Sequence, residues 1–180
     1  MASQLDLPRM HKRVADLLLR VYHVRTPQRT PEWHLRRRTM LTCSDAAAII
    51  GENPYNSRRT VFRRKTGQTR PFIGNSACDH GIKYEPEAAK RYEQATGNVL
   101  LRDDVGLVSH AKWPRIGGSP DGITLCGILI EIKCPLSRKI LPGTIPAEYY
   151  PQVQMLLEIC DLEMAHFVQY RPASLYEEEI

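Results

Sequence analysis

The chain has 180 residues, of which 42% are hydrophobic, so it is long enough to bury a core as one domain without disulfides. No apolar run reaches the roughly 18 residues that cross a membrane, and the polar start lacks a secretion signal, so we expect an intracellular protein with no membrane partner. The five cysteines are scattered without a C-x-x-C pair, which favours free thiols in a reducing compartment over disulfides or zinc.

The net charge of +5 is unevenly distributed along the chain. Residues 1–70 contain fifteen lysines and arginines against five acidic residues, a net charge of +10, so the remaining residues sum to −5. An arginine-rich front half suits a polyanionic partner, because guanidinium groups match the oxygens of phosphate. The alternative is a basic surface that is simply solvated.

The first predicted elements are helical. Residues 8–24 carry apolar side chains at helical spacing, which predicts an amphipathic helix that ends before the polar linker RTPQRTPE. A short helix is expected at residues 33–38, and another within DAAAIIG, where Ser44 and Asp45 can cap the start and Gly51 marks the end. A brief strand or turn, TMLTCS, separates the two.

Two more helices precede a group of strands. Residues 57–65 predict one helix, and residues 77–96 a longer one with Pro86 near its start or at a kink. Strands are expected in NVLLRD and DVGLVSH, then the hairpin DGITLCGILIEIKC, a helix over residues 146–160 and a last strand, AHFVQYRP. This order predicts a single α/β or α+β domain over residues 1–180, with helices flanking a mixed central sheet.

The second strand of the hairpin is unusual, because it carries Glu131 and Lys133 among isoleucines and leucines. Residues i and i+2 of a strand share a face, so both side chains should point to the same side. A three-residue loop centred on Cys126 would set Asp121 opposite Glu131, and two carboxylates and a lysine would then converge. Desolvating such charges is costly unless they are paired or bind a metal.

Two carboxylates with a backbone carbonyl suit Mg²⁺, a hard cation that takes oxygen ligands and keeps several waters. Lys133 beside that ion could hold or deprotonate an attacking water, or neutralise charge on a phosphate. Together with the basic front half, these residues indicate phosphodiester hydrolysis. The alternative is a structural ion pair between Glu131 and Lys133.

The order Pro120-Asp121 and then Glu131-Ile132-Lys133 resembles the signature of the PD-(D/E)xK nuclease superfamily. More narrowly, GGSPDGI…LIEIKCP resembles the YqaJ-type viral recombinases, which include the lambda-type alkaline exonucleases. Three further blocks are similar and follow the same order: residues 31–55 with W-x-x-x-R and T-x-S, the segment GIKYEPEAAKRYEQATG, and residues 149–172 with Q-x-Q. The helix expected at residues 8–24 lies outside the resemblance.

The resemblance implies a restriction-endonuclease-like fold, with a mixed sheet flanked by helices, and a set of site residues. Asp121, Glu131 and the Ile132 carbonyl would bind Mg²⁺, with Mn²⁺ as an alternative ion, and Lys133 would be the catalytic lysine. Glu85, in the matching helix, would complete the acidic cluster and touch a metal directly or through water.

The other acid of that helix, Glu87, is the nearest competitor for the role of Glu85. Gln152 and Gln154 match the family's helix glutamines, and one of them would orient Lys133 or the scissile phosphate. The sequence leaves open which of the two it is, and either amide could instead be a surface group.

Arg37 and Ser44 match the arginine and serine that, in lambda-type members, receive the terminal 5′-phosphate of the degraded strand. The spacing agrees, and a helix start at Ser44 would add backbone N–H groups that suit an anion. Arg36 or Arg38 would take the place of Arg37 if the register were shifted.

The resemblance therefore implies a Mg²⁺-dependent exonuclease that trims double-stranded DNA from 5′ ends for recombination or repair, with a single-strand annealing protein as an expected partner. Lambda-type members continue beyond the strand that ends at Pro172, so their ring-shaped homo-oligomer is not carried over and stays open. One alternative is an endonuclease of the same superfamily. The other is a non-catalytic DNA-binding module that assists recombination.

Overall fold

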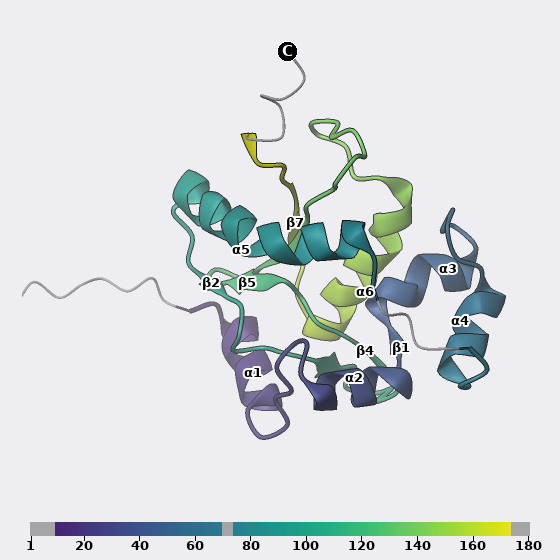
Figure 1. The fold of residues 1–180 in the computed structure, drawn as a ribbon. Helices are drawn as coiled ribbons and strands as arrows, with labels where there is room; N and C mark the ends of the chain where they lie inside the picture. The colour runs from purple at the N-terminus through teal and green to yellow at the C-terminus, as the bar shows by residue number, and fades with distance from the viewer. Residues whose placement is uncertain (1–9, 70–73, 174–180) are drawn as a thin grey trace, which may run out of the picture.

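The strands form two small mixed sheets with helices packed around them (Figure 1). The computed structural model describes residues 10–69 and 74–173. The helical elements are α1 (Lys12–Val21), α2 (Pro31–Arg38), η1 (Cys43–Asp45), α3 (Ala46–Ile50), α4 (Arg58–Lys65), α5 (Ser76–Thr96), η2 (Ala147–Tyr149) and α6 (Tyr150–Cys160). The strands are β1 (Leu41–Thr42), β2 (Leu100–Leu101), β3 (Val108–Ser109), β4 (Ile116–Gly118), β5 (Gly122–Thr124), β6 (Ile128–Lys133) and β7 (Met164–Gln169).

The larger sheet has the order β2-β5-β6-β7 and the smaller one β1-β4-β3. In the larger sheet β6 pairs antiparallel with β5 and parallel with β7, and α6 is the crossover between β6 and β7. The smaller sheet combines the parallel pair β1–β4 with the antiparallel pair β3–β4. This arrangement confirms the predicted α+β class, while the central sheet that the sequence suggested is divided into two.

Strand β4 is absent from the sequence-based expectation, because two of its three residues are glycines, which are depleted in strands. Close packing around β4 requires a glycine at one of these positions, Gly118. A Cβ at Gly118 would overlap Cys43 Sγ and lie 2.8 Å from Leu156 Cδ2. The missing side chain therefore lets η1 and α6 approach the backbone of β4.

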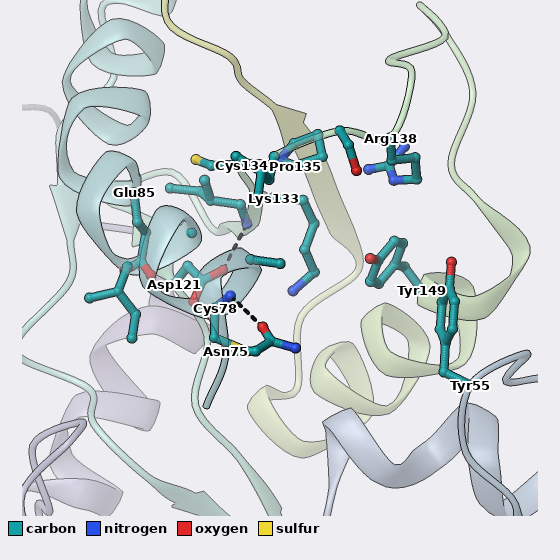
Figure 2. Close-up of a pocket in the computed structure, with 16 residues that line it drawn as sticks. Tyr55, Asn75, Cys78, Glu85, Asp121, Lys133, Cys134, Pro135, Arg138 and Tyr149 are labelled. Atoms are coloured by element: carbon teal, nitrogen blue, oxygen red, sulfur yellow. Dashed lines mark hydrogen bonds between the residues drawn. The ribbon is translucent and has the colours of Figure 1, made fainter. Parts of the chain in front are cut away.

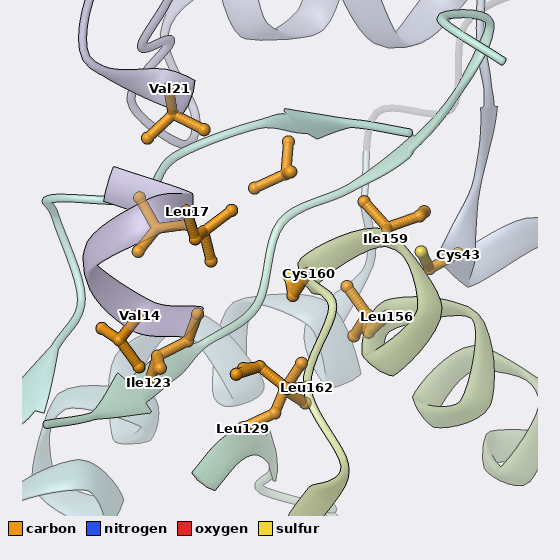
Figure 3. Packing of buried hydrophobic residues seen from close by; sticks show 12 residues of the cluster. Val14, Leu17, Val21, Cys43, Ile123, Leu129, Leu156, Ile159, Cys160 and Leu162 are labelled. Atoms are coloured by element: carbon orange, nitrogen blue, oxygen red, sulfur yellow. The ribbon is translucent and has the colours of Figure 1, made fainter. Parts of the chain in front are cut away.

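The long strand β6 divides the core into two clusters. Leu129 belongs to the cluster between α1, β5 and α6, which Figure 3 shows from close by. Ile130 and Ile132 belong to the second cluster, against Ala88 and Ala89 of α5. The alternation of β6 is thus the predicted one: its isoleucines pack under α5, while Glu131 shares a face with Leu129.

The short helices at the front start differently from expectation. Helix α3 ends at Gly51, which has a φ of 89°, as predicted. Asp45 is its N-cap residue, as expected, but the Asp45 side chain makes no capping hydrogen bond to α3. The side chain of Asp45 instead reaches back and accepts hydrogen bonds from Thr42 N at 3.0 Å and Thr42 Oγ1 at 2.7 Å, which closes the preceding turn η1.

The longer helices follow the sequence pattern closely. Helix α1 covers the middle of the predicted residues 8–24, of which residues 8 and 9 lie outside the described part of the chain. Helix α5 starts ten residues before Pro86, so this proline lies inside the helix. The turn η2 precedes helix α6. Together they span nearly all of residues 146–160, where the sequence predicts a helix.

Candidate active site

The hairpin of β5 and β6 brings the predicted acidic residues together. Gly122 pairs with Ile130 and Ile123 with Leu129, so the next pair in this register is Asp121 with Glu131. Asp121 N donates to Ile130 O at 3.2 Å, and Ile132 N donates to Asp121 Oδ2 at 2.8 Å. The side chain of Asp121 is thereby fixed beside the end of β6.

Glu131 is a buried carboxylate with two very different oxygens. Its side chain is 1% exposed, and Oε1 accepts hydrogen bonds from Lys133 Nζ and from Gln152 Nε2 of α6. Its other oxygen, Oε2, is buried and has no hydrogen-bond partner among the described residues. A buried anionic oxygen without a partner is costly, so this atom is suited to receive a cation or a donor that arrives from outside.

The electrostatics of the three groups also fit a cation. Burial, followed by the negative charge of Glu131, raises the pKa of Asp121 to about 8. Burial alone would lower the pKa of Lys133, but the charges of Glu131 and Asp121 outweigh it and raise this pKa above its ordinary value. Lys133 is therefore an ammonium group, which favours a role in holding water or neutralising phosphate over that of a base.

The two glutamines predicted for α6 are separated by the structure. Gln152 Nε2 lies 2.5 Å from Glu131 Oε1, whereas Gln154 is exposed on the helix surface. Two positions along a helix are about 200° apart, so only one of the pair can face β6. The structure thus brings Gln152, and not Gln154, to the acidic residues.

Glu85 of α5 stands beside Asp121, and both line a cavity of about 610 Å³. Lys133 and Tyr149 line the same cavity, and Figure 2 shows them pointing into it. Glu87 is exposed and accepts a hydrogen bond from the Tyr170 hydroxyl instead. Of the two acids of this helix, Glu85 is therefore the one at the site.

The oxygens of Glu85 are held by two arginines that the sequence reasoning missed. Arg29 and Arg102 each form an ion pair with one carboxylate oxygen, and Arg102 lies just beyond β2. Arg29 belongs to the segment RTPQRTPE, which was interpreted as a linker. Partners 56 and 17 residues away in the chain leave no local signal for such a contact.

Arg37 and Ser44 form a second group of polar residues. Arg37 NH2 donates to Ser44 Oγ at 3.0 Å, and its guanidinium group lies 4.2 Å from the centre of the Trp33 ring. Burial is the main influence on Arg37 and lowers its pKa from the ordinary value. Arg36 donates to Val24 O at 3.0 Å and Arg38 is exposed, so the structure favours Arg37 in this register.

The end of α4 adds cations to this group. Lys65 Nζ lies 3.0 Å from Asp45 Oδ2 and donates to Arg37 O at 2.8 Å, while Arg64 pairs with the other oxygen of Asp45. Asp45 is 3% exposed and offsets part of this positive charge. We call Arg37, Ser44, Arg64 and Lys65 the basic cluster. It combines guanidinium, ammonium and hydroxyl donors, which suits phosphate oxygens.

A metal at the acidic site would depend on few protein ligands. Across residues 10–69 and 74–173, no three or more His, Cys, Asp or Glu side chains are grouped so that they could hold a metal ion. Asp121, Glu131 and the Ile132 carbonyl would therefore supply the protein ligands, with water completing the shell, which is the usual habit of Mg²⁺. The Glu131 oxygen that has no partner among the described residues, beside the carboxyl group of Asp121, gives this end of β6 the oxygen donors that such an ion binds.

The structure also shows the state of the cysteines and whether a described helix could cross a membrane. The five cysteines are all free thiols, and three of them are buried. Within the described part of the chain, no helix has the length and apolar character that crossing a membrane requires.

Comparison with known proteins connects this site to a family. Residues 32–163 match the model of the YqaJ-like viral recombinase domain. The fold resembles an alkaline exonuclease from Laribacter hongkongensis with a TM-score of 0.67 and 30% identity, over 79% of this chain and 74% of that one. Its complex with dAMP gives a TM-score of 0.69 at 30% identity, over 83% and 77% of the two chains.

Viral relatives are similar in sequence. A protein of Acanthamoeba polyphaga mimivirus is 32% identical over an aligned region that covers 79% of this chain and 29% of that protein. A protein of African swine fever virus is 26% identical over an aligned region that covers 90% of this chain and 55% of that protein. The chain thus spans about half or less of the length of these curated relatives.

Proposed function

Because this chain belongs to the family of YqaJ-like viral recombinase domains, we propose that it is a metal-dependent deoxyribonuclease that shortens duplex DNA from its 5′ ends. The observation that carries the proposal is the convergence of Asp121, Glu131, Lys133 and Gln152 at one end of β6. Burying this many polar groups costs stability, and a chemical role accounts for that cost. The resemblance to an alkaline exonuclease supports the same reaction.

The ion in the proposal is Mg²⁺, with Mn²⁺ as an alternative, held by Asp121, Glu131 and the Ile132 carbonyl, with Glu85 joining directly or through water. When bound, it would supply positive charge for the attacking and leaving oxygens of the phosphodiester. Gln152 keeps Glu131 in one orientation through their hydrogen bond. The site can therefore present the same geometry to each new phosphodiester.

Lys133 acts in the proposal as a protonated donor. Its ammonium group can orient the attacking water and neutralise charge that develops on the phosphate oxygens, both of which lower the barrier to hydrolysis. The charges of Glu131 and Asp121 raise its pKa, which favours the ammonium form in this role.

The basic cluster supports the polarity of the proposed reaction. Arg37 and Ser44 would receive the terminal 5′-phosphate, and digestion from that end would proceed from 5′ to 3′. Charge-assisted hydrogen bonds from Arg37 would favour a 5′-phosphate over a 5′-hydroxyl. Lys65, beside Arg37, adds to the positive potential.

We also propose the process, the partner and the compartment in which this activity takes place. A processed 5′ end exposes a single strand, so the product suits recombination or repair, together with a single-strand annealing protein. DNA as the substrate and free thiols as the state of the cysteines both agree with an intracellular, reducing compartment. A homo-oligomer would let one enzyme stay on its substrate through many cycles.

A digestion experiment tests the proposal. Linear duplex DNA and a covalently closed circle are incubated with wild type or Lys133→Ala, in Mg²⁺ or EDTA. We expect wild type to degrade only the linear DNA, with no degradation in EDTA or by the variant. Cleavage of the circle would replace the exonuclease by an endonuclease, and binding without any Mg²⁺-dependent cleavage would leave a DNA-binding module.

A further inference from the structure

Both carboxylate oxygens of Glu85 form ion pairs with arginines. Arg29 NH2 lies 2.5 Å from Oε2 and Arg102 NH2 lies 2.7 Å from Oε1, and the Glu85 side chain is 13% exposed. We call these two arginines the Glu85 clamp. Charge-assisted bonds to a largely buried carboxylate are among the stronger polar contacts in a protein, so this arrangement fixes the orientation of Glu85.

Arg102 contacts both the acid of the helix, Glu85, and the acid of the hairpin, Asp121. Arg102 Nε donates to the backbone carbonyl of Asp121 at 3.2 Å while its NH2 holds Glu85. A single guanidinium group thus joins α5 to the residue before β5. The fork of donors on arginine makes this possible, and the single ammonium of a lysine could not reproduce it.

The other member is held in a strained backbone. Arg29 has a φ of 65°, in the left-handed region that non-glycine residues rarely adopt. The residues around it are tied down: Gln28 Nε2 donates to Pro120 O at 2.9 Å, and Leu107 N donates to Thr26 O at 2.9 Å. The segment RTPQRTPE is therefore fastened to the residue that precedes Asp121, and the strain is kept where it serves Glu85.

Close packing explains why this segment can lie so near. Gly106 has a φ of 64°, and a Cβ there would come within 2.5 Å of Thr26 O. A side chain at this position would push the segment away from Glu85. Gly106 also lines a second cavity of about 240 Å³, together with Arg29, Arg102, Glu85 and Asp121.

The two cavities show from which side the clamp acts. Glu85 and Asp121 line both cavities, whereas Arg29 and Arg102 line the smaller one and are not among the residues of the larger one. The arginines thus contact Glu85 from the side of the smaller cavity. The larger cavity, which Lys133 lines, stays accessible to a substrate. A clamp in this position fixes an acid without blocking the site.

The charges of the clamp have a second effect. Two guanidinium groups face one carboxylate, so a positive charge is left over beside Asp121. This charge opposes any cation that binds at the acids. Fixing Glu85 and attracting a cation therefore work against each other.

We propose that Arg29 and Arg102 are positioning residues of this site, which hold Glu85 in place for turnover and thereby weaken the site's affinity for a divalent cation. The proposal rests on the proposed nuclease function for its effect on turnover, but its effect on cation affinity is independent of DNA. Replacing one clamp arginine should consequently raise the affinity for a divalent cation and lower the turnover.

The test compares Arg102→Gln, Arg102→Lys and Arg29→Gln with wild type, and uses Arg59→Gln, an exposed arginine of α4, as the control. The first readout is the thermal midpoint of the DNA-free protein during a Mg²⁺ titration, which gives the apparent cation affinity. The second is the rate of nucleotide release from linear duplex DNA at saturating Mg²⁺. Midpoints in EDTA report whether each variant is folded.

For the two glutamine variants we expect half-saturation at a Mg²⁺ concentration lower by about threefold or more, since one unit of opposing charge is gone. Turnover should fall by about tenfold or more, since Glu85 is no longer fixed. Arg102→Lys keeps the charge but loses the fork, so its cation affinity should stay near wild type while its turnover still falls. Arg59→Gln should leave the cation affinity unchanged.

Unchanged affinity in both glutamine variants would overturn the proposal, as would a loss of affinity, or a wild type whose midpoint does not respond to Mg²⁺. If wild type binds Mg²⁺ but releases no nucleotide, the proposed nuclease function fails, while the titration still decides the effect of the clamp on cation affinity. The two failures are therefore distinguishable.

Discussion

Gln152 of α6 donates a hydrogen bond to Glu131 of β6, with 2.5 Å between Nε2 and Oε1. The bond joins the crossover helix to the strand that it connects, and it leaves Oε2 of Glu131 as the oxygen without a partner. Lys133 shares Oε1 with Gln152. One oxygen of Glu131 is therefore used to fix the side chain, and the other has no hydrogen-bond partner among the described residues.

This relationship predicts that the two glutamines of α6 differ in importance. Gln152→Ala should lower nucleotide release by about tenfold or more, the scale of one hydrogen bond to a charged group. Gln154→Ala is the matched control and should stay near wild type, because its side chain is exposed. Rates on the same linear duplex check this, and equal losses in both variants would argue against the placement of Gln152.

The raised pKa of Asp121 predicts how stability depends on pH without a metal. The folded protein keeps this proton up to about pH 8, whereas an unfolded aspartate releases it near 3.8. The folded state thus binds more protons between these values, so its stability falls as pH rises through that window. Added Mg²⁺ should raise the thermal midpoint more at pH 8 than at pH 6.

The control for that prediction is Asp121→Asn, which does not titrate in this window. Its midpoint in EDTA should fall less steeply with pH than that of wild type, and Mg²⁺ should have little effect on it at either pH. Identical pH profiles for the two proteins would mean that Asp121 is ionised in the metal-free fold.

The basic cluster predicts a preference for a phosphorylated end. Wild type should degrade a linear duplex with 5′-phosphate ends faster than one with 5′-hydroxyl ends, and Arg37→Gln should reduce that ratio by roughly tenfold, the value of a charged hydrogen bond. Arg38→Gln, which changes an exposed neighbour, should keep the ratio. A ratio near one in wild type would remove the assigned role of Arg37 and Ser44.

Two glycines should respond to alanine with opposite signs. Gly118→Ala brings a Cβ onto Cys43 and Leu156, and should cost about 1–3 kcal/mol of unfolding free energy. Gly81 lies inside α5 with no atom within 4 Å of its added Cβ, so Gly81→Ala should stabilise by about 0.5–1 kcal/mol. Urea unfolding measures both, and a stabilised Gly118→Ala would contradict the close packing of η1 and α6 against β4.

The hairpin acids could be found from sequence because their placement is local. Residues 121 and 131 are joined by a short turn, and the period of two in a strand decides which side chains share a face. Pairing of β6 with β5 follows from the same pattern. The division of the strands into two sheets does not, since β1, β2 and β3 have two residues each and show no periodicity.

Other parts of the site depend on contacts that no local pattern reveals. The choice between Gln152 and Gln154 depends on how α6 is rotated about its axis over β6. The role of Arg29 depends on a loop that looks like a linker and yet lies against Pro120 and Glu85. Lys65 donates to Arg37 from a position 28 residues away in the chain, so its part in the basic cluster appears only in the folded protein.

The most direct measurement is release of nucleotides from a linear duplex labelled at its 5′ ends, by wild type and by Asp121→Asn in saturating Mg²⁺, with DNA binding measured in parallel. We expect wild type to release mononucleotides. The rate of release by Asp121→Asn should be lower by roughly a hundredfold or more, which is the scale of losing a group that supports transition-state charge. DNA binding should persist in both. Undiminished release by Asp121→Asn would contradict the assignment of the reaction to the end of β6.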